Sequence, residues 1–505
     1  MTQGRRGPVS SLWGAGQRTI DGRRLQPAAV TMSASLPLMP RVHAFTDDAL
    51  GDLDAVGLTD ALAAGRVSIP DVVEAAIART ERVAPTLNAL AVACYDRARA
   101  EALHPRGGFF AGVPTFLKDN VDLAGLPTRQ GTDAFAPRPA KRDGDFARMF
   151  LATGLVPIGK TQLSEYGFSA SAEHARLGSV RSPWSTDHTA GASSAGAAAL
   201  VAAGAVPLAH GNDGGGSIRI PAAVNGLVGL KPTRGRLAQD RPLRQMPVRI
   251  VSDGVLTRSV RDSAAFLREA ERVYRDLRLA PVGDVRGPGR ARRSVAVVTE
   301  GIGVRSTPEV DALTRETAEL LESLGHRVEW IEQPMPASFK DDFLLYWSSL
   351  ASVITATGRI EHGRSWDATK LDLFTQGLDH HCRSNVRHLP GATRRLRRSS
   401  RLAAELHGQY DVVLTPTLAG ETPRLGWLDP AQGFDTVMDR LLEWVAFTPV
   451  QNATGAPAIS LPLATTAAGM PQGMQLAAGH GGEAMLLELA YELEEARPWP
   501  LLRDA

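Results

Sequence analysis

The stretch "HGNDGGGSIRIPAA", residues His210–Ala223, places three consecutive glycines before a serine, and a helical pattern follows at once. Glycines have no Cβ atom, so they can adopt positive φ and their backbone N–H groups can approach a ligand closely. A loop of this kind at the start of a helix binds anions. The anion is either a phosphate or the oxyanion that forms when a nucleophile attacks a carbonyl group.

The spacing around the glycines argues against a nucleotide phosphate. A Walker loop requires a lysine after its last glycine, but Ser217 follows Gly216 directly. A dinucleotide-binding fingerprint requires a glycine at the position of Arg219. What remains is a serine beside its own amide donors on a turn into a helix, which suits a nucleophile. A glycine loop without chemistry is the alternative.

A nucleophilic serine needs a base. Two upstream stretches contain candidate partners, a lysine in one and a pair of serines in the other. In "GVPTFLKDN", Lys118 follows an apolar run, and burial can lower a lysine pKa by roughly 3 to 5 units, enough to make it a base. In "GASSAGAAALVAAG", Ser193 and Ser194 precede a helix of small residues. The alternatives are a lysine whose amine reaches water and a serine that caps a helix.

Composition excludes several classes of protein. The chain has 505 residues, of which 43% are hydrophobic and 22% charged, and a net charge of +2 without a basic stripe, so we expect a globular protein that binds no nucleic acid. Cys94 and Cys382 lie far apart and have no ligand spacing, so we expect no disulfide framework and no metal site. The basic residues include only six lysines, and only lysine, not arginine, can lose its proton in a protein.

Short apolar runs alternate with helical stretches along the chain, which predicts an α/β fold with a mixed sheet. The predicted strands are "GLVPIG", "AVPLAHG", "SVAVVTE", "DVVLTP" and "PAISLPL". Ser68 and Asp71 form a capping box that predicts a helix, which buries Val72, Val73, Ala76 and Ile77. We expect one large domain over residues 45–505, with a variable helical segment near residues 335–445.

Residues 1–44 carry scattered arginines and a weakly apolar stretch broken by prolines and hydroxyl residues. That stretch is a poor export signal, and the chain has no apolar run of about 18 residues that could span a membrane. We therefore expect a disordered extension on a cytoplasmic protein that does not bind membranes.

Two longer stretches carry a resemblance to a known family. They are "AGASSAGAAALVAAGAVPLAHGNDGGGSIRIPAAVNGLVGLKPTRGR" over residues 190–236 and "GVPTFLKDNVDLAGLPTRQGT" over residues 112–132. With Lys118, Ser193 and Ser217 in this order, the chain resembles the amidase signature family. The likeness continues through "DVVLTPTLAGETP" and covers roughly residues 50–500.

The resemblance implies a mixed sheet covered by helices on both faces and a Ser-cisSer-Lys triad. Ser217 is then the nucleophile, Ser193 the bridging serine and Lys118 the base, and the peptide bond from Ala192 to Ser193 is cis. The implied activity is hydrolysis of a small linear or cyclic carboxylic acid amide to acid and amine or ammonia, through a serine acyl-enzyme. No metal or cofactor takes part, and a homodimer is common in the family.

The glycine loop takes its role from the same resemblance. The backbone N–H groups of Gly214, Gly215 and Gly216, with that of Ser217, would form the oxyanion hole. Asp213 and Arg219 flank the nucleophile, and we expect them to form a structural ion pair. Many members of the family have threonine or isoleucine where this chain has Gly214, and a subgroup that includes hydrolases of linear and cyclic amides shares the glycine.

Aromatic residues of the helical segment are candidates for an acyl pocket, although residues of this kind are more often core. The candidates are Phe343, Tyr346, Trp347 and Phe374, with Trp444 and Phe447 further along.

Two other functions stay open at this point. "ASSAG" nearly fits the nucleophile elbow of an α/β-hydrolase esterase, with Ser194 as nucleophile and His388, His407 or His480 as partner. The glutaminase subunit of a tRNA-dependent amidotransferase has the same signature and triad, but it works within a complex.

Overall fold

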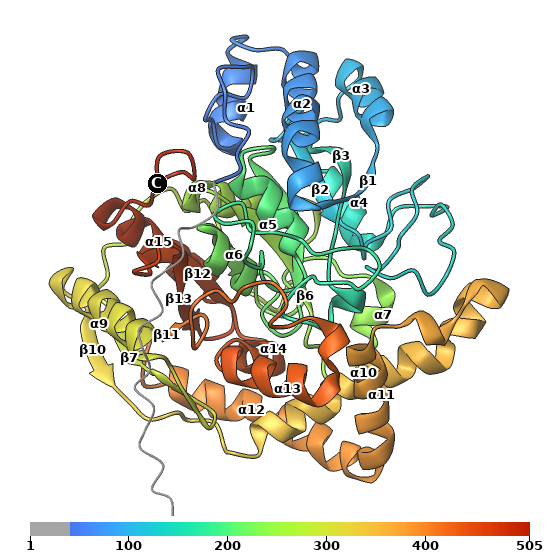
Figure 1. Ribbon diagram of the computed structural model, residues 1–505. Coiled ribbons are helices and arrows are strands. Elements are labelled where there is room, and N and C mark those ends of the chain that lie inside the picture. Colours follow the sequence, from blue (N-terminus) through green and yellow to red (C-terminus); the bar gives the residue numbers. More distant parts are fainter. Residues whose placement is uncertain (1–40) are drawn as a thin grey trace, which may run out of the picture. The chain divides into compact units, whose positions relative to one another are not determined.

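The centre of the computed structural model, which describes residues 41–505, is a mixed sheet of eight strands (Figure 1). The strand order is β10 (Arg327–Trp330), β7 (Ser294–Val297), β11 (Val412–Pro416), β13 (Pro471–Ala478), β12 (Ala458–Thr465), β5 (Val228–Lys231), β6 (Ser252–Thr257) and β4 (Leu208–Asp213). β10, β7 and β11 run parallel, and the other neighbours are antiparallel. The α/β fold with a mixed sheet is confirmed, and four of the predicted apolar runs supply strands of this sheet.

A smaller sheet brings Lys118 to the edge of the large one. It consists of β1 (Leu90–Ala93), β3 (Val156–Thr161, the remaining predicted run) and β2 (Pro114–Lys118). β2 lies beside β4, because Thr115 Oγ1 donates to the Leu208 carbonyl at 3.0 Å and the Lys118 N–H donates to His210 Nδ1 at 3.1 Å. The last residue of β2 therefore lies next to the end of β4, where the glycine loop begins.

Helices cover both faces of the large sheet, as two neighbouring residues of β13 show. A Cβ on Gly473 would lie 2.4 Å from the Cβ of Ala223 in α6 (Arg219–Asn225), so this position faces α6. Met474 points to the opposite face, since neighbouring residues of a strand alternate. There its sulfur accepts a hydrogen bond from Thr314 of α9 (Pro308–Ser323) at 3.6 Å.

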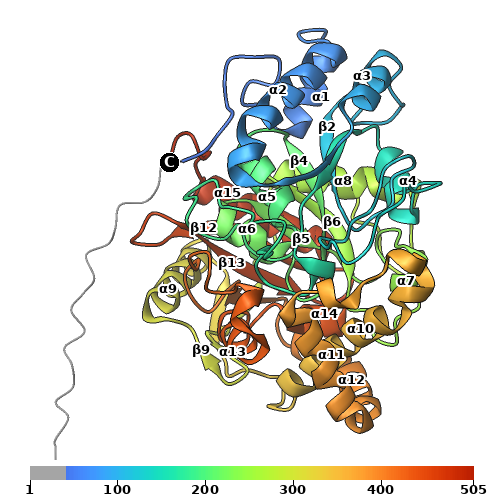
Figure 2. The same ribbon diagram turned by 45° about the vertical axis from the view of Figure 1, so that its right-hand side comes forward.

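The other elements surround this core (Figures 1 and 2). They are α1 (Ala55–Ala63), α2 (Ile69–Leu87), α3 (Tyr95–Leu103), α4 (Asp145–Leu151), α5 (Ala195–Ala202), α7 (Arg241–Arg244), α8 (Val260–Val273), α10 (Phe339–His362), α11 (Leu373–Asn385), α12 (Leu389–His407), α13 (Phe434–Trp444), α14 (Pro449–Thr454) and α15 (Glu483–Ala496), with a ribbon of β8 (Glu300–Gly301) and β9 (Val304–Arg305). α10 to α14 gather at the bottom of both views.

Small residues let α5 pack deep inside the protein. A Cβ on Gly196 would lie 2.5 Å from the Ala89 carbonyl oxygen and 2.7 Å from that of Gln162. Every residue of α5 is buried, and the helix packs against β2, β4 and α6. This close packing holds Ser193 and Ser194, which immediately precede α5, against Lys118.

The local signals of the first long helix are confirmed. Ser68 is the N-cap of α2, and its Oγ accepts a hydrogen bond from the Asp71 N–H at 3.2 Å. The four residues predicted for its apolar stripe are all buried.

The structure differs from the prediction in two segments of the chain. The helical segment near residues 335–445 contains α10 to α13, but it also contains β11, which lies inside the large sheet. Of the extension expected over residues 1–44, residues 1–40 lie outside the described part. The last residues of that range are packed, because the N–H groups of Val42 and Ala44 donate to the carbonyls of Pro183 at 2.9 Å and Ala203 at 2.7 Å. No helix within residues 41–505 is long and apolar enough to cross a membrane.

We expect Gly473→Ala to lower the stability of the protein by about 1 to 3 kcal/mol, because the added methyl group would overlap Ala223 of α6. Thermal unfolding followed by fluorescence measures the change. Gly287→Ala is the matched control, since a Cβ there meets nothing within 4 Å. Equal unfolding temperatures for the two variants would contradict the close packing of α6 on β13.

Candidate active site

Lys118 is fully buried at the end of β2, and its Nζ is surrounded by neutral oxygen atoms. The Nζ lies 2.7 Å from Ser193 Oγ, 3.1 Å from Ser194 Oγ and 2.6 Å from Asn212 Oδ1. Ser194 Oγ itself donates to the Asn212 carbonyl at 3.2 Å. The two candidate residues Lys118 and Ser193 are therefore in direct contact.

The hydrogen bonds around Lys118 suit a neutral amine. A neutral amine has two N–H groups and one lone pair. The amide oxygen of Asn212 can only accept, and Ser194 Oγ also accepts from Lys118 because its own proton is directed to a carbonyl. These two acceptors use both N–H groups, so the lone pair faces the hydroxyl of Ser193.

Burial lowers the pKa of Lys118 to about 7, although the carboxylates of Asp213 and Asp253 act in the opposite direction. Its neighbour His210 is also buried, and burial lowers the pKa of the imidazole. His210 Nδ1 accepts the Lys118 N–H, so its Nε2 carries the proton and faces Asp253 at 3.3 Å. At neutral pH a large fraction of Lys118 is thus unprotonated in an environment without a direct ion-pair partner.

The glycine loop connects β4 to α6 and ends at Ser217, which is 6% exposed. Within residues 41–505, the N–H groups of Gly214, Gly215 and Ser217 donate to no protein acceptor. The N–H of Gly216 donates to Asp213 Oδ1 at 2.7 Å, so the prediction that Gly216 is a free donor is wrong in this structure. The loop therefore has three N–H groups, those of Gly214, Gly215 and Ser217, that are free to bind a ligand atom.

Asp213 and Arg219 form the predicted ion pair, and it is fully buried. Arg219 Nε and Nη2 donate to the two carboxylate oxygens of Asp213, each at 2.8 Å. Burial raises the pKa of Asp213, but Arg219, with Lys231 and Asn452, outweighs it and lowers the pKa to about 2. The pair holds the two ends of the glycine loop together.

Sequence reasoning missed the residues that complete this network. Arg219 also donates to Gln451 Oε1 at 3.1 Å, Asn452 Oδ1 at 2.7 Å and Gln475 Oε1 at 2.7 Å. Gln451 and Asn452 lie on α14, and Gln475 lies on β13. Their only signal in the sequence is the presence of uncharged polar residues within apolar stretches.

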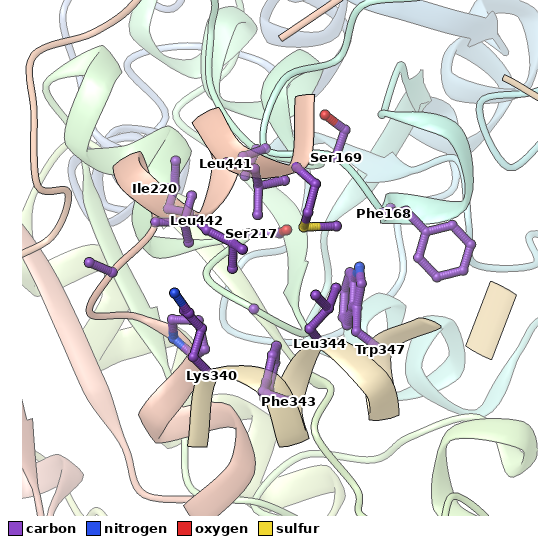
Figure 3. A pocket seen from close by; sticks show the side chains of 18 of the residues that line it. Phe168, Ser169, Ser217, Ile220, Lys340, Phe343, Leu344, Trp347, Leu441 and Leu442 are labelled. Atoms are coloured by element: carbon purple, nitrogen blue, oxygen red, sulfur yellow. The ribbon is translucent and has the colours of Figure 1, made fainter. Parts of the chain in front are cut away.

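A largely apolar cleft of about 810 Å³, part of it open to solvent, lies in front of Ser217 (Figure 3). Three of the predicted aromatic residues line it: Phe343, Trp347 and Phe374. The other lining residues include Phe168, Ser169, Ala192, Ile220, Ile302, Phe339, Lys340, Leu344, Met438, Leu441, Leu442 and Val445.

The remaining predicted aromatic residues do not line this cleft. The Tyr346 hydroxyl donates to the Val248 carbonyl at 2.8 Å within a buried cluster. Trp444 Nε1 donates to the Gly420 carbonyl at 3.0 Å, and Phe447 lines a separate cavity. The hydroxyl of Tyr346 and the indole N–H of Trp444 are thus bound by backbone carbonyls, which is a structural role.

Gly214 has a second role beside its free amide. A Cβ at this position would lie 3.2 Å from the ring of Trp347, which lines the cleft. A threonine or isoleucine there would displace that ring. The glycine therefore leaves room for the Trp347 ring in the wall of the cleft that Ser217 also lines.

The structure of Ser193 and Ser194 differs from two expectations. No peptide bond among the described residues is cis, so the cis bond before Ser193 implied by the resemblance is not present; Ser193 Oγ reaches Lys118 through a trans peptide. Ser194 is the N-cap of α5 by position, but its side chain bonds Lys118 and Asn212 instead of the helix. An esterase based on Ser194 would need a histidine at this hydroxyl, and none is hydrogen-bonded to it among residues 41–505.

The comparisons with known proteins agree on one family. The family model described as Amidase matches residues 71–487. The "Putative amidase AmiC" of Mycobacterium leprae is 62% identical over 91% of this chain and 98% of that protein. The 6-aminohexanoate-cyclic-dimer hydrolase of Paenarthrobacter ureafaciens is 33% identical over 88% of this chain and 95% of that protein.

Solved structures give the same result. A 6-aminohexanoate cyclic dimer hydrolase complexed with substrate superposes with a TM-score of 0.80 at 30% identity, over 88% of this chain and 97% of that chain. A bacterial aryl acylamidase of the amidase signature family superposes with a TM-score of 0.79 at 27% identity, over 88% of this chain and 96% of that chain.

We expect Arg219→Met to destabilise the protein by about 3 to 5 kcal/mol, because Asp213 would keep a buried charge without its partner. The loss should decrease at low pH, where Asp213 becomes protonated. Thermal unfolding measured at several pH values tests both points. Arg383→Met is the control, since Arg383 is largely exposed and an i,i+4 ion pair of this kind, here with Asp379 on α11, contributes only about 0.3 to 0.5 kcal/mol. A similar loss in both variants would show that the buried pair has no special role.

Proposed function

The chain belongs to the amidase family and hydrolyses carboxylic acid amides, and we propose that Lys118, Ser193 and Ser217 carry out this reaction through a serine acyl-enzyme. The observation that carries the proposal is the contact of 2.7 Å between Ser193 Oγ and the fully buried Nζ of Lys118. A buried amine with a pKa near neutrality is a usable general base.

The first step activates the nucleophile. The lone pair of neutral Lys118 takes the proton of Ser193, and Ser193 takes the proton of Ser217 as Ser217 Oγ attacks the amide carbonyl carbon. In the absence of substrate, Ser217 Oγ is hydrogen-bonded to no residue within 41–505. We infer that its contact with Ser193 forms when a substrate fills the cleft, since catalytic hydrogen bonds commonly tighten in the complex.

The negative charge of the tetrahedral intermediate falls on the former carbonyl oxygen. The free N–H groups of Gly214, Gly215 and Ser217 would donate to it. Losing one such donor typically costs about 100-fold to 1,000-fold in turnover. Gly216 contributes indirectly, because its bond to Asp213 fixes the turn.

The intermediate then releases the amine. The proton held by Lys118 returns through Ser193 to the nitrogen of the leaving group, the C–N bond breaks, and Ser217 keeps the acyl group. A water molecule repeats the attack with the same relay, and the acid leaves while Ser217 recovers its proton. These steps use the side chains of Lys118, Ser193 and Ser217, the backbone N–H groups of the loop and water.

The cleft indicates the kind of amide. Because its wall is almost entirely apolar, we propose a small amide with an aliphatic or aromatic body. The relatives named above act on a cyclic dimer and on aryl acylamides, according to their names. The homodimer and the cytoplasmic location implied by the resemblance stay predictions.

A fluorophosphonate probe with a measured amide hydrolysis tests the assignment of the nucleophile. We expect the probe to modify Ser217, detected by peptide mass spectrometry, and Ser217→Ala to lose both modification and hydrolysis by at least about 1,000-fold, as for other enzymes that lose a catalytic serine. Ser323→Ala, at the exposed end of α9, should keep both. Hydrolysis that survives in Ser217→Ala would overturn the proposal.

The pH profile tests the base. Below the pKa of Lys118, near 7, the amine is protonated and cannot accept a proton, so kcat/KM should fall about tenfold per pH unit as the solution becomes more acidic. Asn212→Asp places a carboxylate beside the Nζ in nearly the same shape, which favours the charged amine and should move the midpoint upward by about 1 to 3 units. A profile that is flat near neutrality, or the same in both proteins, would exclude Lys118 as the base.

A further inference from the structure

Among the described residues that line the cleft, only Lys340 carries a charge. It is the second residue of α10, and its side chain is half-buried. The wall around it consists of aliphatic and aromatic side chains with two serines, Ser169 and Ser217. A single cation in such an environment can distinguish one polar group of a ligand.

The position of Lys340 on α10 determines where its side chain points. Lys340, Phe343, Leu344 and Trp347 recur at spacings of three and four residues, so they share one face of the helix. All four line the cleft, and Figure 3 shows their side chains rising together from the helix toward the space in front of Ser217. Lys340 is thus part of the wall that meets a substrate.

Nothing in the described protein neutralises Lys340. Within residues 41–505, no carboxylate forms an ion pair with its Nζ, and the Nζ donates to no protein acceptor. Asp341 and Asp342 follow it on the helix, but neither lines the cleft. The carboxylate of Asp342 is bound by Arg395, with distances of 2.8 Å and 2.5 Å. Among residues 41–505, Lys340 therefore takes part in no ion pair that would give it a structural role.

We propose that Lys340 binds a carboxylate of the substrate, so that this enzyme prefers amides with an apolar body and a carboxylate at the end remote from the scissile bond. The proposal rests on the proposed function, because it takes Ser217 as the point of attack. The apolar wall holds the body of the substrate, and the ammonium group of Lys340 forms a charge-assisted hydrogen bond with the carboxylate. The cleft thereby selects a substrate with an apolar body and one charged end, and it fixes the orientation in which that substrate binds.

Matched pairs of amides test this preference. For the acyl side, the neutral probe is hexanoyl 4-nitroanilide, and the charged probe is the mono-4-nitroanilide of adipic acid. For the amine side, the hexanoyl amides of 4-aminobenzamide and 4-aminobenzoate form the pair. We expect kcat/KM to be about tenfold or more higher for the charged member of one pair, as for other hydrogen bonds to charged groups. The pair that shows the effect identifies the side that faces Lys340.

Two substitutions connect the preference to this residue. In the pair that shows the effect, Lys340→Met should reduce the ratio of kcat/KM for the charged member to that for the neutral member to about one, and Lys340→Glu should reverse the preference, so that the neutral member is hydrolysed faster than the carboxylate. Lys141→Met, at an exposed position away from the cleft, should keep the ratio of the unchanged enzyme. Unfolding temperatures show that each variant is folded.

The outcomes separate this inference from the proposed function. The role of Lys340 is refuted, and the mechanism stands, if kcat/KM is the same for the neutral and the charged amide in both pairs. The same conclusion follows if Lys340→Met keeps the preference for the charged amide. If no amide is hydrolysed and the fluorophosphonate leaves Ser217 unmodified, the proposed function itself fails, and the inference fails with it.

Discussion

The proposed chemistry depends on a lysine that is buried without a bound carboxylate. Lys118 Nζ is hydrogen-bonded to neutral oxygens of Ser193, Ser194 and Asn212, so burial lowers its pKa to about 7. Asp213 is near enough to act against this shift, but its charge is compensated by Arg219. Arg219 therefore has two effects: it holds the glycine loop, and it limits the pull of Asp213 on the proton of Lys118.

Two other buried lysines show why burial alone does not identify a base. Lys160 is as buried as Lys118, but it forms an ion pair of 2.5 Å with Asp119. Burial lowers the pKa of Lys231 to about 7 as well, yet its Nζ donates to the carbonyl of Pro232. Only Lys118, of these three, places its amine against a serine hydroxyl. A perturbed pKa becomes a catalytic property when the lone pair has a proton to accept.

Local sequence signals predicted the parts of the site that depend on neighbouring residues. The order of Lys118, Ser193 and Ser217 identified the family, and the glycines predicted the turn into α6. The sequence could not predict that Gly216 donates to Asp213, because Gly216 and its two glycine neighbours are identical in sequence and differ only in the path of the backbone. Nor could it predict Gln475 as a partner of Arg219, 256 residues away, since only the pairing of β13 with β12 and β11 brings that side chain to α6.

In the proposed mechanism the glycine loop couples the reaction to the choice of substrate. Its backbone leaves the N–H groups of Gly214, Gly215 and Ser217 free, and the missing side chain of Gly214 also leaves space for the ring of Trp347. Trp347 lies on the face of α10 that carries Lys340, so the loop and this helix face together enclose the cleft. A larger residue at position 214 would keep its own N–H but would displace the ring of Trp347, because only 3.2 Å separates the ring from such a Cβ. The shape of the cleft can therefore change at this position while the amide donors stay in place.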